Sequence, residues 1–267
     1  MKIVALVKTP SDLQAAAKVL VEASSGMTLA EARMRLAPEP PALLARLVPE
    51  AADALANRLQ AGGLAALAVS TLVPPGRVAV RHAQFDAASV RLRPRLGEPL
   101  ELAYQDIAVI LRGASSVRSQ TEAREKQKSL AIGTALATGG LKMTKTTDRL
   151  VHSSSEEVEQ SIFVYAADGR SAVLHELSME FAWLGAALQP SRTANMTAIA
   201  KMFRDRAPAA FYDERLVRLG RRPMPFLAVG ETQVRTDRGS TSSQDTAGVL
   251  DILAEVLHQA ARQRMLP

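Results

Sequence analysis

The sequence predicts an α+β protein, in which a small β-α-α-β-α-β domain is followed by an antiparallel β domain and a C-terminal helix. Two kinds of periodicity predict this fold. Apolar residues recur at helical spacing between short β-branched runs over residues 1–71, and they alternate with polar residues over 78–111. Pro74-Pro75-Gly76 separates the two patterns, since proline and glycine end regular elements. The predicted domains are 1–73, 74–235 with a basic insertion at 114–160, and 236–267.

The first domain carries signals for three strands and three helices. Lys2–Val7 is the first strand, and Ser11–Gln14 has the form of a capping box, which satisfies free amides at a helix start. Thr28–Glu31 is a second capping box. Pro49 suits the first position of a third helix, and Gly62-Gly63 supplies its left-handed C-terminal cap. Strands are predicted before and after this third helix.

These elements carry a resemblance to a known family. The stretch Lys18–Val69 resembles the C-terminal domain of the ribosomal stalk protein, whose fold is shared with the adaptor of the bacterial N-end-rule protease. The matching motifs are the helix start at Gly26–Arg33, Ala37-Pro38 at the end of that helix, and Ala61-Gly62-Gly63 before the last strand. The resemblance implies a compact module that docks other proteins through its helix faces.

One departure from the family bears on the partner. The stalk family usually reads Gly-Leu-Gly-Leu-Lys-Glu-Ala-Lys at this helix start, whereas Ala30 here replaces the first lysine and Arg33 the second. The first lysine contacts translation GTPases in that family, so this role is not carried over. We expect Arg33, Arg35 and Arg46 to tune the docking of a different protein partner.

The second domain is predicted to contain short strands followed by one helix. Ile162–Tyr165 and Ala172–Leu174 flank Asp168-Gly169, which predicts a hairpin. Asn195 is the predicted cap of an amphipathic helix that closes at Ala207-Pro208. The segment Leu100–Gly113 resembles bacterial pleckstrin-homology-like domains, which implies a barrel plugged by that helix. Phe181 and Trp183 are interpreted as core residues, with an exposed recognition patch as the alternative.

The insertion at 114–160 is predicted to be a long basic loop. Residues 112–149 carry eight basic and three acidic side chains, a net charge of +5. The loop either has no role or meets an acidic partner or a membrane surface, with Lys126, Lys128, Lys142 and Lys145 as the candidate contact residues. Gly139-Gly140 precedes two of these lysines, but the spacing of a phosphate-binding P-loop is not met.

The last segment is predicted to be a polar linker over 235–243 and an amphipathic helix. Apolar residues follow one another at helical spacing from Val249 to Ala260. We expect this helix to pack on its own chain, and self-association through residues 245–264 is the alternative.

Composition excludes several function classes. The chain has 267 residues, no cysteine and 4% aromatic residues, which excludes disulfide frameworks and thiol nucleophiles and disfavours stacking platforms for single strands. No apolar run approaches the ~18 residues of a membrane span, so we expect a cytoplasmic protein. The net charge of +6 is mild for a nucleic-acid-binding protein.

Sequence motifs for catalysis are missing. His82, His152, His175 and His258 include no pair at helical metal-ligand spacing. Neither Gly-x-Ser-x-Gly nor Gly-x-Gly-x-x-Gly occurs. We therefore expect no enzyme activity, no cofactor and no metal. The predicted function is that of an adaptor that docks a protein through the stalk-like domain. The alternative is a nucleic-acid- or ribosome-associated protein that uses the basic stretches 112–149 and 196–222.

Overall fold

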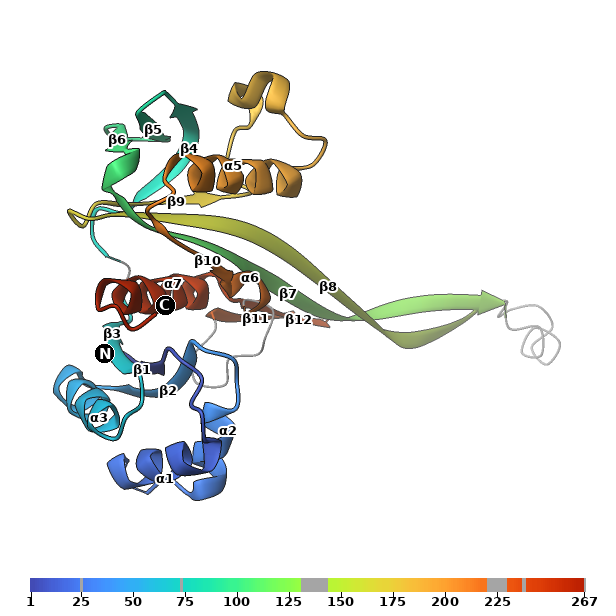
Figure 1. Ribbon diagram of the computed structural model, residues 1–267. Helices are drawn as coiled ribbons and strands as arrows, with labels where there is room; N and C mark the ends of the chain where they lie inside the picture. The colour runs from blue at the N-terminus through green and yellow to red at the C-terminus, as the bar shows by residue number, and fades with distance from the viewer. Residues whose placement is uncertain (25, 73, 131–143, 220–229, 237–238, 267) are drawn as a thin grey trace, which may run out of the picture. The chain divides into compact units, whose positions relative to one another are not determined.

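The computed structural model describes residues 1–24, 26–72, 74–130, 144–219, 230–236 and 239–266. It confirms the α+β class, with a small antiparallel sheet and a larger mixed sheet (Figure 1). The chain divides into two compact units. The main unit comprises Met1–Ser115, Val158–Ala228 and Thr246–Pro267, and the second unit comprises Ser116–Glu157 and Val229–Asp245.

The first 70 residues form the predicted β-α-α-β-α-β module. Its sheet is antiparallel with the strand order β2-β1-β3, so the first strand lies in the middle. The elements are β1 (Lys2–Leu6), α1 (Leu13–Ala23), α2 (Leu29–Leu36), β2 (Ala42–Leu47), α3 (Pro49–Ala61) and β3 (Ala66–Ser70).

The helix caps of this module agree with the sequence at three of four places. Thr28 and Glu31 form the predicted capping box of α2, Pro49 occupies the first turn of α3, and Gly63 after α3 has a positive φ of 81°. The Ser11 cap was wrong. Asp12 caps α1 instead, because its carboxylate accepts hydrogen bonds from the amides of Gln14 and Ala15 at 2.8 and 3.1 Å.

Both faces of the small sheet are buried. Val4 and Leu6 of β1 face the helices α1–α3 and belong to the module's core. Ile3 and Ala5 alternate with them and are also buried, and α7 (Ala247–Arg262) packs against β3. The module therefore shares the C-terminal helix with the rest of the main unit (Figure 1).

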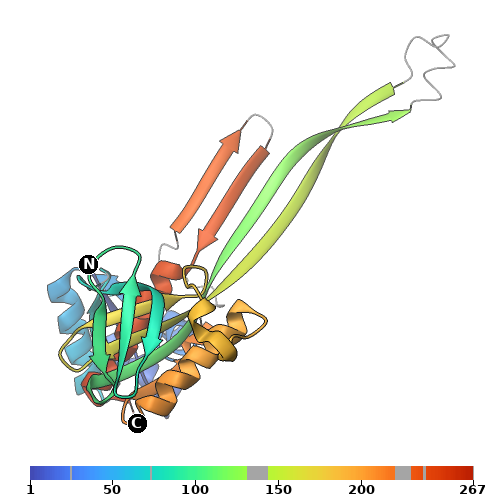
Figure 2. The same cartoon turned by 90° about the horizontal axis from the view of Figure 1, so that it is seen from above.

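The larger sheet is mixed because β9 returns parallel to β4, and β10 lies parallel to β7. Its main path runs β11-β12-β7-β8-β9-β4-β5-β6. Figure 2 shows β4, β5 and β6 side by side. The strands are β4 (Val78–Phe85), β5 (Ser89–Pro94), β6 (Leu100–Ala103), β7 (Ile107–Leu130), β8 (Thr144–Ala166), β9 (Ser171–His175), β10 (Phe211–Arg215), β11 (Gly230–Thr236) and β12 (Gly239–Asp245).

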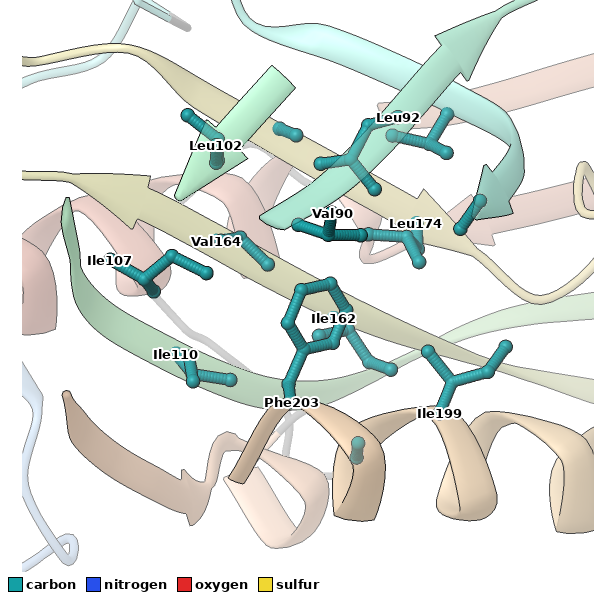
Figure 3. Close-up of a cluster of buried hydrophobic side chains, with 14 of the residues drawn as sticks. Val90, Leu92, Leu102, Ile107, Ile110, Ile162, Val164, Leu174, Ile199 and Phe203 are labelled. Atoms are coloured by element: carbon teal, nitrogen blue, oxygen red, sulfur yellow. The ribbon is translucent and has the colours of Figure 1, made fainter. Parts of the chain in front are cut away.

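The α5 helix covers one face of this sheet. The long helix of this region is α5 (Arg192–Arg206). The shorter helical segments are η1 (Tyr104–Asp106), η2 (Ala182–Ala187) and α6 (Leu216–Leu219). Ile199 and Phe203 of α5 point toward Ile162 and Val164 of β8 in one buried cluster (Figure 3). Phe181 belongs to this cluster, which confirms that it is a core residue, and Trp183 is partly buried and packs against the cluster.

The cap predicted for this helix was wrong. Ser191 is the cap, and its hydroxyl accepts a hydrogen bond from the amide of Ala194 at 3.1 Å. Asn195 is buried one turn inside α5. Its side-chain oxygen accepts a hydrogen bond from the amide of Gln189 at 2.7 Å. Asn195 therefore holds the segment that precedes α5 in place and does not cap the first turn of the helix.

The α7 helix covers the opposite face. Phe163 and Tyr165 alternate along β8 with the residues that face α5, and Tyr165 stacks on His258 of α7 with the ring centroids 3.9 Å apart. The apolar stripe of α7 is thus buried within the chain. This confirms that the helix packs on its own chain, and the stripe is not exposed for self-association through residues 245–264.

Two segments predicted without regular structure are strands. Residues of the 114–160 insertion belong to β7 and β8, and the 235–243 linker overlaps β11 and β12. In the second unit β12 pairs with β7 in antiparallel register from Gly239↔Ala123 to Asp245↔Val117. Figure 2 shows β11 and β12 as neighbouring strands. Polar residues form these strands, so apolar alternation could not reveal them.

Candidate functional site

The N-terminal module contains a groove with a volume of about 400 Å³. It lies where the turn between α1 and α2 meets β2 and α3. We call it the module groove. Its lining residues are Ala23, Ser24, Gly26, Met27, Glu31, Arg35, Ala45, Leu47, Ala51, Leu55 and Arg58. Most of these side chains are apolar, and the charged ones are two arginines and one glutamate.

The turn between α1 and α2 depends on two local features. Gly26 has a backbone φ of 81°, a conformation that residues with a Cβ atom rarely adopt. The capping box then fixes the start of α2, because the amide of Thr28 donates to Glu31 Oε2 at 2.8 Å. Together they place Met27 and Glu31 in the wall of the groove.

The charges around the groove are held in different ways. The guanidinium of Arg35 donates to the carbonyl oxygen of Leu44 at 2.6 Å and so ties α2 to β2. Hydrogen bonds from the backbone and side chain of Thr28 lower the pKa of Glu31, which keeps this exposed carboxylate ionised. Arg58 is exposed on α3 and, among the described residues, bonds only to the Ala54 carbonyl, at 3.4 Å. The two guanidinium groups leave a net positive charge around the groove.

The residues expected to bind a partner are only partly brought together. Arg35 lines the groove. Arg33 and Arg46 are exposed but do not line it. Arg46 lies between two lining residues of β2, and successive side chains of a strand point to opposite faces. The side chains of Lys126, Lys128, Lys142 and Lys145 lie outside the described residues.

The floor of the groove could not be predicted from the sequence. Met27, Leu47 and Leu55 have the spacing of ordinary core residues, and so does Ala45. Nothing in a single sequence separates a core position from a position at the edge of a hollow. Arg58 was also missed, since a lone arginine in the last turn of a helix is common.

The main unit also contains a buried ionic cluster between α7 and the large sheet. The side chain of Arg77 is only 3% exposed and donates to Asp251 at 2.9 Å, to Glu255 at 3.4 Å and to the Tyr165 hydroxyl at 3.1 Å. His258 Nδ1 lies 3.3 Å from Glu255. Such clusters can support acid–base chemistry, but these groups pair with one another beneath α7. Within the described residues, Arg77 Nε is the one atom of this guanidinium that is buried without a hydrogen-bond partner. We interpret the cluster as an attachment of the helix to the sheet.

The protonation of this cluster follows from burial and pairing. Burial raises the pKa of Tyr165 above its ordinary value of 10.0, so the phenol stays neutral. Burial raises the pKa of Asp251 despite the neighbouring Arg77 charge. For Glu255, burial acts to raise the pKa, but hydrogen bonds from His258 and Gln259, together with the neighbouring positive charges, lower it overall. The pKa values of the two carboxylates are therefore shifted in opposite directions.

A serine and a histidine also meet in the sheet. Ser161 Oγ lies 2.9 Å from His175 Nδ1. A nucleophilic serine must reach a substrate, but Ser161 is only 1% exposed. In the described part of the chain, no hydrogen bond joins His175 to Asp251. The pair therefore connects β8 to β9 and does not form an accessible catalytic site.

The other features that bear on function are metal ligands, membrane spans and the two remaining histidines. Among the residues that the structure describes, no group of three or more His, Asp and Glu could hold a metal ion. Over the same ranges, no helix is long and apolar enough to cross a membrane. His82 lies beside Trp183, with ring centroids 6.0 Å apart. The side chain of His152 lies outside the described residues.

The basic stretch at 196–222 is largely paired within the chain over its described residues 196–219, and Arg221 and Arg222 lie outside the described residues. Lys201 bonds to Asp205 at 2.7 Å, and Arg215 to Asp213 at 2.7 Å. Arg206 donates to the carbonyl oxygen of Asp86 at 2.5 Å. These contacts do not favour a continuous positive surface for nucleic acid.

Comparisons with protein-family models, curated proteins and solved structures found no match to this chain. The resemblances to the ribosomal stalk domain and to pleckstrin-homology-like domains therefore remain predictions.

Proposed function

We propose that this protein is a non-catalytic adaptor that docks a protein partner through the module groove. The groove itself is the observation that supports the proposal, because it combines an apolar floor with charged side chains in the module for which docking is predicted. Its volume of about 400 Å³ lies within the ~300–1,000 Å³ of ordinary ligand pockets.

The proposed ligand is a short segment with a large apolar side chain next to a carboxylate. The floor formed by Met27, Leu47 and Leu55 suits the apolar side chain. Arg58 is exposed, and its one hydrogen bond to the described residues is a long one within its own helix, so it is available to a carboxylate. An ionised Glu31 on the same groove disfavours a second acidic group on its side.

The size of the groove limits the affinity of this contact. Burial of one large apolar side chain contributes about 1.5–3 kcal/mol, and a charge-assisted hydrogen bond contributes a similar amount. The groove alone therefore supports weak, reversible binding. Weak docking suits an adaptor, whose second contact increases the overall affinity.

The proposal is tested with a random-peptide phage library and the purified full chain. We expect selected peptides to pair a large apolar residue with an aspartate or glutamate. Ala51 is exposed and lines the groove, so Ala51→Trp fills it. This variant should bind the selected peptides at least about tenfold more weakly.

Ala15→Trp is the matched control. Ala15 is also an exposed alanine at the third position of a helix, α1, but it does not line the groove. We expect the control to change affinity by less than about twofold, because surface substitutions away from a site have small effects. Equal loss in both variants, or no enrichment of peptides, contradicts the proposal. Binding of RNA or DNA with a steep salt dependence would favour the nucleic-acid alternative instead.

A further inference from the structure

A second and larger groove lies elsewhere in the main unit. Its volume is about 790 Å³, and it is formed by the segment after β1, the segment before β2, the end of α5, β10 and α6. We call it the junction groove. Its lining residues are Val7, Lys8, Thr9, Glu39, Pro40, Arg204, Tyr212, Asp213, Glu214, Arg215, Arg218 and Leu266.

Each carboxylate of the junction groove already has a guanidinium partner. Asp213 accepts from Arg215 Nε at 2.8 Å, and its side chain is 9% exposed. Glu39 pairs with Arg218 at 2.9 Å. Glu214 pairs with Arg112, which lies outside the groove, at 3.2 Å. These pairs neutralise the negative charge of the wall.

Two cations of the groove have no such partner. Lys8 is exposed and makes no hydrogen bond or ion pair with any residue that the structure describes. Arg204 likewise has no carboxylate partner within the described ranges. Its guanidinium carbon lies 5.5 Å from the centre of the Tyr212 ring, a contact that orients the group and leaves its N–H donors available. The groove therefore carries two uncompensated positive charges.

We propose that the junction groove binds a small molecule that carries a phosphate group. A phosphate is close to a dianion at neutral pH, so it matches the two uncompensated charges. The planar fork of a guanidinium binds two phosphate oxygens, and an ammonium group adds a compact point charge. The volume suits a small molecule. This site is distinct from the module groove, and its test does not depend on the proposed adaptor function.

The test measures binding of inorganic pyrophosphate and of ATP to the full chain by isothermal titration calorimetry at low salt. We expect saturable binding of at least one probe. Lys8→Gln and Arg204→Gln should each weaken it by about tenfold, the effect of losing one charge-assisted contact. Lys18→Gln is the control, since Lys18 is also an exposed lysine without an ion pair to the described residues, but it lies on α1 and does not line this groove.

The outcomes separate a built site from unspecific attraction. Binding of pyrophosphate alone identifies a free phosphate ligand, and tighter binding of ATP identifies a nucleotide-like one. Equal weakening in all three variants would show a diffuse charge effect and overturn the proposal. Absence of saturation by either probe would also overturn it. If Arg204→Gln does not fold, Lys8→Gln decides, because Lys8 is exposed and makes no hydrogen bond or ion pair with the described residues, so its substitution should leave the fold intact.

Discussion

Arg77 and Asp251 lie 174 residues apart in the chain and form an ion pair of 2.9 Å. Arg77 directly precedes β4, and Asp251 lies in the second turn of α7. The guanidinium also lies 5.4 Å from the centre of the Phe163 ring and 5.5 Å from that of Tyr165. One buried cation thus connects the C-terminal helix to the large sheet, while the same helix packs on the small sheet.

We expect Arg77→Met to lower the free energy of unfolding by about 3–5 kcal/mol, because it leaves the buried Glu255 and the partly buried Asp251 without their cation. Urea denaturation followed by circular dichroism measures the change. The control is Arg81→Met, which removes an exposed pair with Glu180 from the adjoining strand β4. Exposed pairs contribute about 0–1 kcal/mol. A loss at position 77 no larger than at position 81 contradicts the attachment role of this cation.

The pH dependence of stability should separate the two acidic partners. The folded-state pKa of Glu255 is lowered from 4.5, so its contribution is present above pH 4.5 and is lost as the pH falls through the lower folded pKa. The folded-state pKa of Asp251 is raised from 3.8, so protonation of Asp251 has the opposite sign and favours folding.

Denaturation curves at a series of pH values below 5 test this assignment. Glu255→Gln should flatten the decline in stability on acidification, because the carboxylate that loses its contribution is gone. Asp251→Asn should steepen the decline, because it removes a group whose protonation opposes it. Identical pH profiles for the two variants would contradict the assigned directions.

Much of the fold follows from local sequence. The helix caps at Thr28 and Pro49, the turn at Asp168-Gly169 and the apolar face of α5 each depend on neighbouring residues, which a pattern can capture. The strands of the 114–160 insertion do not follow from local sequence. Their polar residues are paired with distant strands, and such pairing leaves no apolar alternation to detect.

The ionic cluster and the module groove were less predictable than the fold, because both depend on contacts between segments that are far apart in the sequence. Glu255 and His258 are polar residues next to the apolar stripe of α7, and such residues usually lie at the exposed edge of a helix. Both are buried here, because Arg77 and Tyr165 on the sheet side contact them. Met27 and Leu55 have core spacing, but three separate elements leave a hollow beside them. Both features arise from tertiary contacts between distant segments.

The cap of α1 provides a direct comparison of sequence and structure. Asp12→Ala should lower the free energy of unfolding by about 1 kcal/mol, since it removes acceptors for two free amides. Ser11→Ala should have almost no effect, because Ser11 is exposed and makes no hydrogen bond with the described residues. Chemical denaturation of both variants measures the difference. The reverse order of effects would restore Ser11 as the cap.

A substitution of Ser24, at the end of α1, should stabilise the protein or leave its stability unchanged, in contrast to Asp12→Ala. Its hydroxyl is buried and has no hydrogen-bond partner within the described chain. An unsatisfied buried hydroxyl costs about 1–3 kcal/mol, so Ser24→Ala should raise the free energy of unfolding or leave it unchanged. Because Ser24 also lines the module groove, peptide binding should be measured on the same variant. A clear loss of stability would show that the hydroxyl has a partner, such as a buried water, that holds the end of α1 in place.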